Sequence, residues 1–536
     1  MTATEPAALA GPGSRPGTSE LPPAPARPGP RDAPPRTGPG AARWLALHQR
    51  SLLVLFGALV VTGAAMAWNL QGFPGRANDD EGTYVARAWA MIAQHHLANY
   101  TYFWDHPFLG WATIAAWALA TDGFSRDLRA VMAGRELMWA TTLVAAALVY
   151  ALSRRLAMNR FFAVTAVLLF GLSPLAIWYH RMVSLDNLAT MWALAAFALA
   201  ASHRRSLASI VWSGACFAAA TWSKETIAII VPALLWQVGQ HLGGDGAGRG
   251  YSVRRKYIRA FLVVYCGIVG LYPLMAVIKG ELLPGAGHVS LLGEIYYQLA
   301  GRSSTGSLLD PRSGTYQQAA QWVATDPWLT LGALAALAAA FAVRRYRPVA
   351  LALLVQVLYM VKGGYVPYAY VTALLPFAAV LIAGTLDWLW SRRAAWFRLP
   401  VLAAAVACAA LMLPAWGRSL VAQSRANGFA AQDAAVAWIG RHLTQGQVVV
   451  CDDYVWPDLR LRTRTTPVYL WTIDYDPAVM RDYLPDGYRD IRYLVLDPSS
   501  PLTYTALPGR PTLAAALRHA TVIATFGSID VYQVTR

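Results

Sequence analysis

The chain has 536 residues, of which 56% are hydrophobic and only 14% are charged. A soluble globular protein usually carries about 25% charged residues, so this composition excludes an ordinary soluble protein and indicates an integral membrane protein. The 45 Lys and Arg residues exceed the 29 Asp and Glu residues, which gives a net charge of +16. The excess is divided among short runs between apolar stretches, whereas a nucleic-acid-binding protein would gather it on one surface. We therefore expect no nucleic-acid partner.

Residues 1–42 consist mainly of Pro, Gly, Ala and Arg. Such a segment cannot bury enough apolar surface to offset the entropy lost on ordering. It is also unlike a signal peptide, because the first apolar stretch comes late and is long enough to remain as a membrane span. We predict a disordered cytoplasmic tail.

Residues 43–420 predict an all-α, polytopic transmembrane domain. At roughly 17–25 residues per span, the apolar stretches give about eleven transmembrane helices. The predicted spans are 51–70, 131–152, 161–179, 186–202, 207–222, 225–241, 258–278, 327–343, 347–362, 366–390 and 399–416. The stretch 108–121 is also apolar but is too short to cross a bilayer easily.

Basic residues set the predicted orientation. With the N-terminus in the cytoplasm, the basic clusters, such as Arg154-Arg155 and Arg344-Arg345, all lie in cytoplasmic loops. No loop on the other side carries a comparable cluster, which is the positive-inside pattern. We expect a multi-pass protein of the plasma membrane in which most acidic residues, and any acid–base chemistry, face outward.

Three large segments are predicted on the outer side. They are the first outer loop, 71–130, the second, 279–326, and the tail that follows about residue 420. In the tail the pattern changes to short β runs with helical segments between them. The runs are 447–451, 466–470, 493–496, 521–526 and 529–534, and the helical segments are 430–443 and 512–519. This pattern predicts a small extracytoplasmic α/β domain over residues 425–536.

The first outer loop carries the acidic run Asn78-Asp79-Asp80-Glu81, followed by a helical pattern over residues 84–97. One interpretation is a helix start, in which Asn78 is the N-cap, Glu81 is its capping-box partner and the helix dipole favours the carboxylates. The other is an active-site acid. The two are compatible, because a helix N-terminus also fixes a carboxylate in space.

Farther along the same loop, residues 104–111 read Trp-Asp-His-Pro-Phe-Leu-Gly-Trp. A first span, an outer-loop Asp-Glu, an interfacial helix and then His-Pro-x-Leu-Gly together resemble the polyprenyl-phosphate-sugar-dependent glycosyltransferases of the GT-C fold. These include the protein O-mannosyltransferases (glycosyltransferase family 39) and the lipid A aminoarabinose transferase. Phe108 stands where many relatives have a second Pro, but the His106-Pro107 element is intact.

The resemblance implies transfer of a sugar from a polyprenyl-phosphate donor to an acceptor hydroxyl on the outer face of the membrane, with inversion. The lipid phosphate is the leaving group, so the enzyme needs a base for the acceptor proton and cations for the phosphate. The family's outer-loop Asp is that base, and Asp80 is the matching position. Glu81 would bind or orient the acceptor, and Asp79 would be a capping or solvated residue.

The residues expected to bind the substrate are His106, Arg181, Asp186 and Lys224. Cations predicted at the outer membrane boundary are candidates for binding the donor phosphate: Arg181, Lys224, Lys279, Arg302 and Lys362. Each of them is also explained as a long side chain that snorkels from the end of a span. Arg181 with Asp186 is the preferred pair, and Lys224 alternatively pairs with its neighbour Glu225.

The remaining properties stay open at the level of sequence. Asp80, Glu81 and His106 are candidate ligands for a divalent metal ion, but they lack a diagnostic spacing. The default sugar is mannose, and the acceptor is a protein, a glycan or a lipid. A transporter or flippase of a lipid-linked or polar substrate is the alternative function. It would predict repeated halves and helices broken near the membrane midplane, and the charges here lie at span ends.

Overall fold

A computed structural model of the chain describes residues 41–75, 80–203, 206–241, 249–285, 287–391, 395–498 and 509–535. The chain divides into two compact units, Met1–Arg50 and Ser51–Arg536, and the second holds nearly all of the described residues. The predicted tail, residues 1–42, lies outside the described residues except for its last two, with which helix α1 begins.

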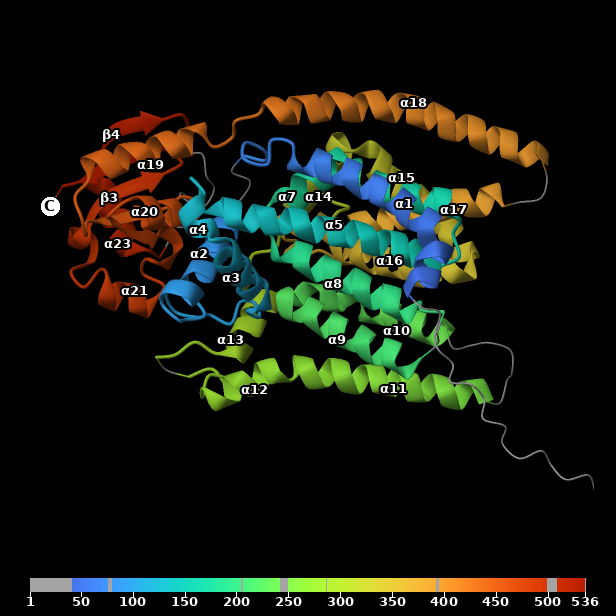
Figure 1. Cartoon of the computed structure of the whole chain (residues 1–536). Helices are drawn as coiled ribbons and strands as arrows, with labels where there is room; N and C mark the ends of the chain where they lie inside the picture. Colours follow the sequence, from blue (N-terminus) through green and yellow to red (C-terminus); the bar gives the residue numbers. More distant parts are fainter. Residues whose placement is uncertain are drawn as a thin grey trace, which may run out of the picture. The chain divides into compact units, whose positions relative to one another are not determined.

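Helices make up most of the second unit (Figure 1). The long or apolar helices are α1 (Ala41–Ala67), α5 (Val131–Arg155), α6 (Arg160–Leu172), α7 (Pro174–Arg181), α8 (Leu185–Ala200), α9 (Leu207–Ser223), α10 (Val231–His241), α11 (Arg249–Val269), α12 (Leu271–Ile278), α15 (Pro327–Ala342), α16 (Arg347–Lys362), α17 (Leu375–Trp390) and α18 (Ala395–Arg425). Shorter helices between them are α2 (Asp80–Ala93), α3 (Leu109–Thr121), α4 (Gly123–Arg126), α13 (Leu291–Tyr296) and α14 (Gly314–Thr325). The turn η2 (Tyr297–Gly301) continues α13, and η1 (Glu225–Ile230) precedes α10.

Five helical segments in the described part of the chain are long and apolar enough to cross a membrane: 48–67, 131–155, 254–278, 368–390 and 398–442. Two bent pairs, α6 with α7 and α14 with α15, bring the number to seven if each pair is one span. The chain is thus rich in membrane-type helices, but the predicted eleven spans are not confirmed. Helices α3, α8 and α9 are apolar and shorter than a full span.

The bend between α6 and α7 has a local cause. Pro174 begins α7 and has no N–H to continue the hydrogen bonds of α6. Ser173 caps the new helix by accepting a hydrogen bond from the amide of Ala176. The two helices meet at 62° within the predicted span 161–179. The C-terminal end of α7, with His180 and Arg181, is therefore turned away from the line of α6.

The helical core is packed with small side chains. On α8, which packs against α5 and α9, Ala189, Ala193 and Ala196 are fully or almost fully buried. Small residues let helix backbones approach closely, which is how helices pack inside a membrane where no hydrophobic effect drives them together.

Residues 448–534 form a five-stranded mixed sheet. Its strands are β1 (Val448–Cys451), β2 (Thr466–Tyr469), β3 (Ile491–Leu496), β4 (Ala520–Phe526) and β5 (Ile529–Val534), in the order β2-β1-β3-β5-β4. Strands β2, β1 and β3 are parallel, and β5 and β4 are antiparallel to their neighbours. The helices of this segment are α19 (Ala430–His442), α20 (Trp456–Arg462), α21 (Pro477–Asp482) and α23 (Pro511–Arg518).

Strand β1, between β2 and β3, is buried on both faces of the sheet. Val449 and Cys451 belong to one buried cluster, and Val450 between them belongs to another. This is the two-residue period of a strand, and a continuous apolar run is typical of a parallel strand covered on both sides. All five predicted β runs are confirmed as strands. The sheet belongs to the same compact unit as the helices, so a separate extracytoplasmic domain at 425–536 stays a prediction.

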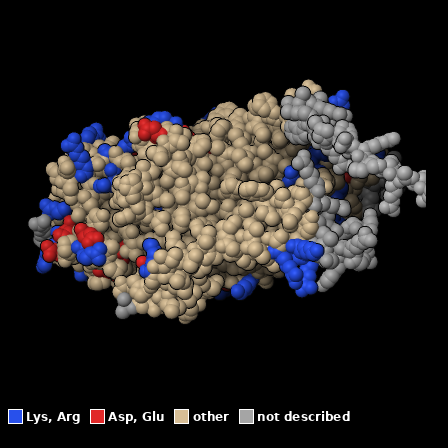
Figure 2. All heavy atoms as spheres, turned by 60° about the horizontal axis from the view of Figure 1, so that its bottom comes forward, with Lys and Arg blue, Asp and Glu red and all other residues tan. Residues whose placement is uncertain are grey.

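The sheet, α2, α3 and α13 lie at one end of the long helices, whereas α11 begins at the opposite end (Figure 1). Figure 2 shows one face of the molecule, and the middle of that face carries almost no charged atoms. Acidic and basic residues (red and blue) gather at the end that holds the sheet, and basic residues recur toward the opposite end. An uncharged belt between charged ends is what a bilayer requires. The first outer loop and the sheet thus share one end of the unit.

Candidate functional site

Helix α2 begins at Asp80, the third residue of the predicted acidic run. Asn78 and Asp79 lie outside the described residues, so their predicted capping roles stay predictions. Asp80 is exposed, whereas Glu81 is only 3% exposed. Two adjacent carboxylates at the start of one helix therefore have opposite environments.

Glu81 is held in a closed ion pair. Arg135 of α5 donates from Nε and Nη2 to its two carboxylate oxygens at 3.1 and 2.9 Å. The amide of Val183 donates to Oε1 at 2.8 Å, and Arg135 also donates to the carbonyl of Pro74 at 2.7 Å. These three donors hold the carboxylate of Glu81, and its expected capping-box contact with Asn78 lies outside the described residues and stays a prediction. Its proposed contact with the acceptor stays untested.

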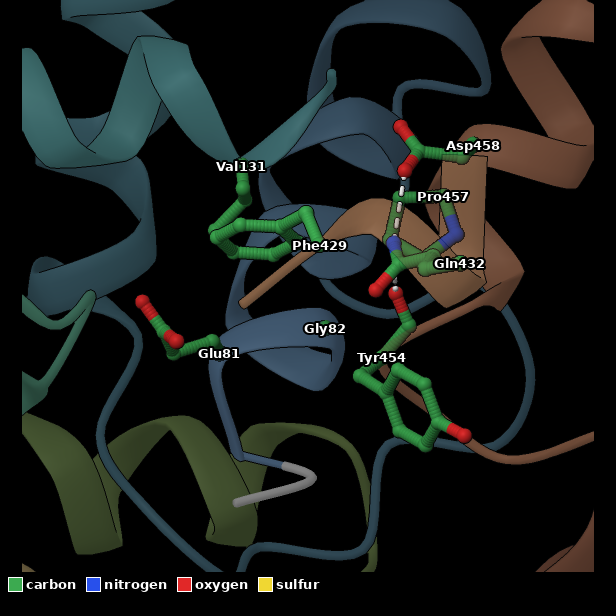
Figure 3. Close-up of a pocket in the computed structure, with 8 residues that line it drawn as sticks. All are labelled: Glu81, Gly82, Val131, Phe429, Gln432, Tyr454, Pro457 and Asp458. Carbon is green, nitrogen blue, oxygen red and sulfur yellow. Dashed lines mark hydrogen bonds between the residues drawn. The ribbon is translucent and has the colours of Figure 1, made fainter. Parts of the chain in front are cut away.

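A small pocket lies beside Glu81, between α2 and the C-terminal segment (Figure 3). Gln432 bridges the carboxylate of Asp458 and the carbonyl of Tyr454, while the Glu81 carboxylate points away from them. The pocket has a cavity volume of about 10 Å³, which is roughly the room that one water molecule needs. This pocket belongs to the packing of α2 and is too small for a sugar.

Gly82 is what lets α2 approach this segment. A Cβ atom there would lie 2.0 Å from the carbonyl oxygen of Asp453 and 2.6 Å from the Cα of Tyr454. On the next residue, the hydroxyl of Thr83 donates to the carboxylate of Asp453. The start of α2 is therefore seated directly on the turn that follows strand β1.

A second buried pair holds the loop that carries His106. Arg87 of α2 donates two hydrogen bonds to Asp105, at 2.9 and 2.8 Å, and its guanidinium lies 4.8 Å from the centre of the Trp111 ring. Burial alone would raise the pKa of Asp105, but the positive charges of Arg87 and Lys224 and the hydrogen bonds from Arg87 lower it to about 2. Asp105 is thus a fixed anion that orients the loop.

His106 links two further predicted residues. Its Nε2 lies 2.8 Å from Nζ of Lys224, and its Nδ1 lies 3.0 Å from the carboxylate of Glu225. The ammonium can only donate, so Nε2 accepts and Nδ1–H donates to Glu225. The alternative that Lys224 pairs with Glu225 is not what the structure shows, since His106 stands between the two.

Two tyrosines, Tyr84 and Tyr365, interact with the other charged residues of this region. Tyr84, buried one helical turn after Asp80, interacts electrostatically with Asp80, Asp186 and Asp105. Tyr365 interacts with Arg302, Asp80 and Lys224, and the Arg302 guanidinium lies 3.5 Å from the centre of its ring. The charge of Lys224 also acts on Asp186. The structure therefore gathers Asp80, His106, Asp186 and Lys224 in one polar region.

Arg181 is placed elsewhere. It is 1% exposed and donates from Nη2 to the carbonyls of Ala65 and Trp68 at the end of α1, at 2.6 and 2.7 Å. Asp186 instead accepts a hydrogen bond from Ser184, the N-cap of α8, at 2.9 Å. In the described part of the chain no ion pair joins Arg181 to Asp186, so the preferred pair is not brought together.

Among the described residues, no group of three or more His, Cys, Asp and Glu side chains could hold a metal ion. The candidate set Asp80, Glu81 and His106 is not assembled, because Glu81 is engaged by Arg135 and both ring nitrogens of His106 have partners. The residues as placed do not fit a divalent cation, and no step of the proposed chemistry depends on one.

Sequence reasoning missed the residues that position the site, above all Arg135, Arg87 and Tyr84. Arg135 had a detectable signal, since a charge inside the predicted span 131–152 needs a partner. Arg87 lies in the helical pattern over residues 84–97, which is not a predicted membrane span, so its charge gave no sign that it needs a partner. Its pairing with Asp105 depends on how the loop folds back over α2.

Part of the sequence and almost the whole fold resemble those of known proteins. Residues 105–269 match the family described as dolichyl-phosphate-mannose-protein mannosyltransferase. This stretch includes His106, Asp186 and Lys224 and is less than half of the chain. No curated protein matches the sequence.

Solved structures match almost the whole chain at low sequence identity. ArnT from Cupriavidus metallidurans bound to undecaprenyl phosphate is 14% identical, with 92% of this chain and 98% of that chain covered and a TM-score of 0.57. The apo oligosaccharyltransferase of Archaeoglobus fulgidus is 14% identical, with 92% and 75% covered and a TM-score of 0.55. Both are glycosyltransferases of the GT-C fold, so the predicted resemblance is confirmed and the chain has that fold.

Proposed function

We propose that the chain is a membrane glycosyltransferase that moves a sugar from a polyprenyl-phosphate donor to an acceptor hydroxyl. The observation that carries this proposal is that the first outer loop supplies Asp80, an exposed carboxylate at a helix start, and His106, whose Nε2 lies 2.8 Å from the buried ammonium of Lys224. Transfer from a lipid phosphate needs these two groups, a base on the acceptor side and a cation on the phosphate side.

Asp80 accepts the acceptor proton. It is exposed at the first position of α2, so an incoming hydroxyl can reach it. Its neighbour Glu81 anchors the helix start through Arg135, which holds the Asp80 backbone in place. Deprotonation lets the hydroxyl oxygen attack the anomeric carbon from the face opposite the lipid phosphate, which inverts that centre. A positioned base typically contributes about 10²–10⁴-fold in rate.

Lys224 binds the departing phosphate. It is 5% exposed, and its hydrogen-bond partner in the described part of the chain is the imidazole Nε2 of His106. An ammonium has three N–H donors, so two remain for phosphate oxygens. Glu225 holds His106 in the tautomer that accepts from Lys224. Arg302, stacked on Tyr365, supplies a second cation.

The donor class is supported by the comparisons. The ArnT structure holds undecaprenyl phosphate, and the matched family is described as using dolichyl-phosphate-mannose. Undecaprenyl phosphate and dolichyl phosphate are both polyprenyl phosphates. These lipids are named for the ArnT structure and for the matched family, and not for this chain. For this chain we propose the shared chemistry, a sugar on a polyprenyl phosphate, with mannose as the first donor to test.

The proposal is tested with membranes that contain the protein and a panel of polyprenyl phosphates carrying radiolabelled mannose, arabinose, galacturonic acid or aminoarabinose. The expected result is movement of one label from the lipid fraction to a second molecule, in membranes from wild-type cells only. Movement of intact labelled lipid across the bilayer, with no cleavage of the sugar–phosphate bond, would instead establish a flippase and contradict the proposal.

A further inference from the structure

An aromatic shelf borders the candidate site and has no part in the proposed transfer chemistry. It consists of Phe103 from the first outer loop and Trp471 and Tyr475 from the segment that follows strand β2. The rings of Phe103 and Tyr475 are stacked at 5.1 Å with 24° between their planes. Trp471 lies 5.9 Å from Phe103 and 6.2 Å from Tyr475. Phe103 is buried, whereas Tyr475 is 52% exposed.

The shelf is rigidly supported. The indole N–H of Trp471 donates to Asp453 at 2.8 Å, and the hydroxyl of Thr101 donates to Asp476 at 2.7 Å. Asp476 is itself fully buried and caps α21. A large exposed aromatic ring on fixed supports loses little conformational entropy when a ligand covers it, which favours binding.

Polar groups surround the shelf. Tyr475 interacts electrostatically with Glu294, Tyr297 and Asp105, and Arg510 interacts with both Tyr475 and Tyr297. Glu294 also interacts with His106 and Arg302 of the proposed site. The shelf therefore lies between the sheet and the proposed site. The carboxylate of Glu294 and the guanidinium groups of Arg302 and Arg510 lie between them or beside them.

We propose that this shelf binds a sugar ring of a glycan acceptor, which makes the acceptor a carbohydrate. The inference rests on the proposed glycosyltransferase function. A pyranose has an apolar face of C–H groups and a rim of hydroxyls, which matches a flat aromatic surface with a polar rim. A stable protein partner would bury about 800 Å² on each side around an apolar centre, and here the exposed rings of Tyr475 and Tyr297 stand among charged groups.

The test is direct binding to the full-length protein in lipid nanodiscs, because detergents with sugar headgroups would compete. The probes are mannotriose, chitotriose and arabinotriose, and a peptide rich in Ser and Thr stands for a protein acceptor. Tryptophan fluorescence and saturation-transfer NMR report the Kd. We expect one trisaccharide to bind, Tyr475→Ala to raise its Kd at least tenfold, and Tyr475→Phe to bind as wild type does, since it keeps the ring.

Tyr296→Ala is the matched control, because Tyr296 is 71% exposed on α13 and makes no ring contact among the described residues. Its Kd should equal that of the wild type. Binding of the peptide and of no trisaccharide would overturn the proposal, and so would an unchanged Kd in Tyr475→Ala.

The binding experiment needs no sugar donor, so it tests the shelf proposal independently of the proposed transferase function. Trisaccharide binding that depends on Tyr475, in a protein that cleaves no donor of the panel, would contradict only the transferase function. If Tyr475→Ala left donor cleavage and sugar transfer unchanged, only the proposal that the shelf binds the acceptor would be contradicted.

Discussion

At the residue scale, Asp80 and Glu81 show how one helix start separates two carboxylates that the sequence cannot rank. Asp80 faces solvent, while Glu81 turns inward to Arg135 and the amide of Val183. The sequence placed both acids in the outer loop, and family resemblance selected Asp80. The buried role of Glu81 depends on Arg135, which lies on another helix, and no local pattern could reveal that pairing.

Glu81→Gln should destabilise the fold. Removing one partner of a buried ion pair leaves the other charge uncompensated and typically costs about 3–5 kcal/mol. Arg135 is fully buried, so water cannot replace the lost charge. We expect a clearly lower unfolding temperature, measured by intrinsic fluorescence in detergent.

Glu136→Gln is the matched control on the same helix, because its partner Arg126 is exposed and surface pairs contribute about 0–1 kcal/mol. A Glu81→Gln protein with the stability of the wild type but no transfer activity would show that Glu81 acts on the substrate instead.

At the element scale, the contact between α2 and the turn after β1 depends on a glycine. In Gly82→Ala the added methyl group would meet the backbone of Asp453 at 2.0 Å, and backbone cannot move aside as a flexible side chain can. We expect α2 to be displaced, with a loss of about 1–3 kcal/mol of stability and reduced transfer because Asp80 moves with the helix. Thermal unfolding and transfer rate measure the two effects.

Gly417→Ala is the control for Gly82→Ala. A Cβ atom at Gly417, within α18, meets nothing within 4 Å, and Ala is the better helix former by roughly 0.5–1 kcal/mol. This variant should be as stable as the wild type or slightly more so. Equal behaviour of the two variants would refute the close approach of α2.

Helix α20 is docked on the start of α5 by a titratable group. Asp458 accepts hydrogen bonds from the amide of Ala130 and from Gln432, both at 2.7 Å. Burial raises the pKa of Asp458 from 3.8 to about 6, against the opposing effect of these hydrogen bonds. Between these two values the folded chain binds the proton and the unfolded chain does not, so stability rises as pH falls.

Asp458→Asn should remove this pH dependence. The wild type should gain stability relative to the variant as pH falls from 7 to 4, by on the order of 1–3 kcal/mol, and lose that gain as pH rises through about 6. Unfolding temperatures of both proteins from pH 4 to pH 7.5 measure the difference. A constant difference across this range would contradict a raised pKa in the folded state.

At the scale of the whole molecule, composition and the spacing of apolar stretches were enough to predict a helical membrane protein, and short β runs were enough to predict all five strands. The number of spans was not predictable in this way. The 62° bend at Ser173-Pro174, for example, interrupts an apolar stretch that looks continuous in sequence. Long-range pairs such as Arg87 with Asp105 form only after the loop folds back.

The predicted orientation can be tested by labelling single cysteines in intact cells. The native Cys216, Cys266, Cys408 and Cys451 are first replaced by Ser. Arg518→Cys, at an exposed position of α23 in the sheet segment, should react with a membrane-impermeant maleimide. Arg255→Cys, exposed on α11, should react only after the cells are permeabilised. The reverse pattern would place the sheet in the cytoplasm.

The central claim is that Asp80 is the base that activates the acceptor. The most direct measurement is the transfer rate of purified Asp80→Asn beside that of Asp122→Asn, an exposed acid of the same loop in a left-handed conformation (φ 52°) that Asn tolerates. The account predicts a loss of at least about 10²-fold for Asp80→Asn, with an unchanged unfolding temperature, and a wild-type rate for Asp122→Asn. Full transfer activity in Asp80→Asn would contradict it.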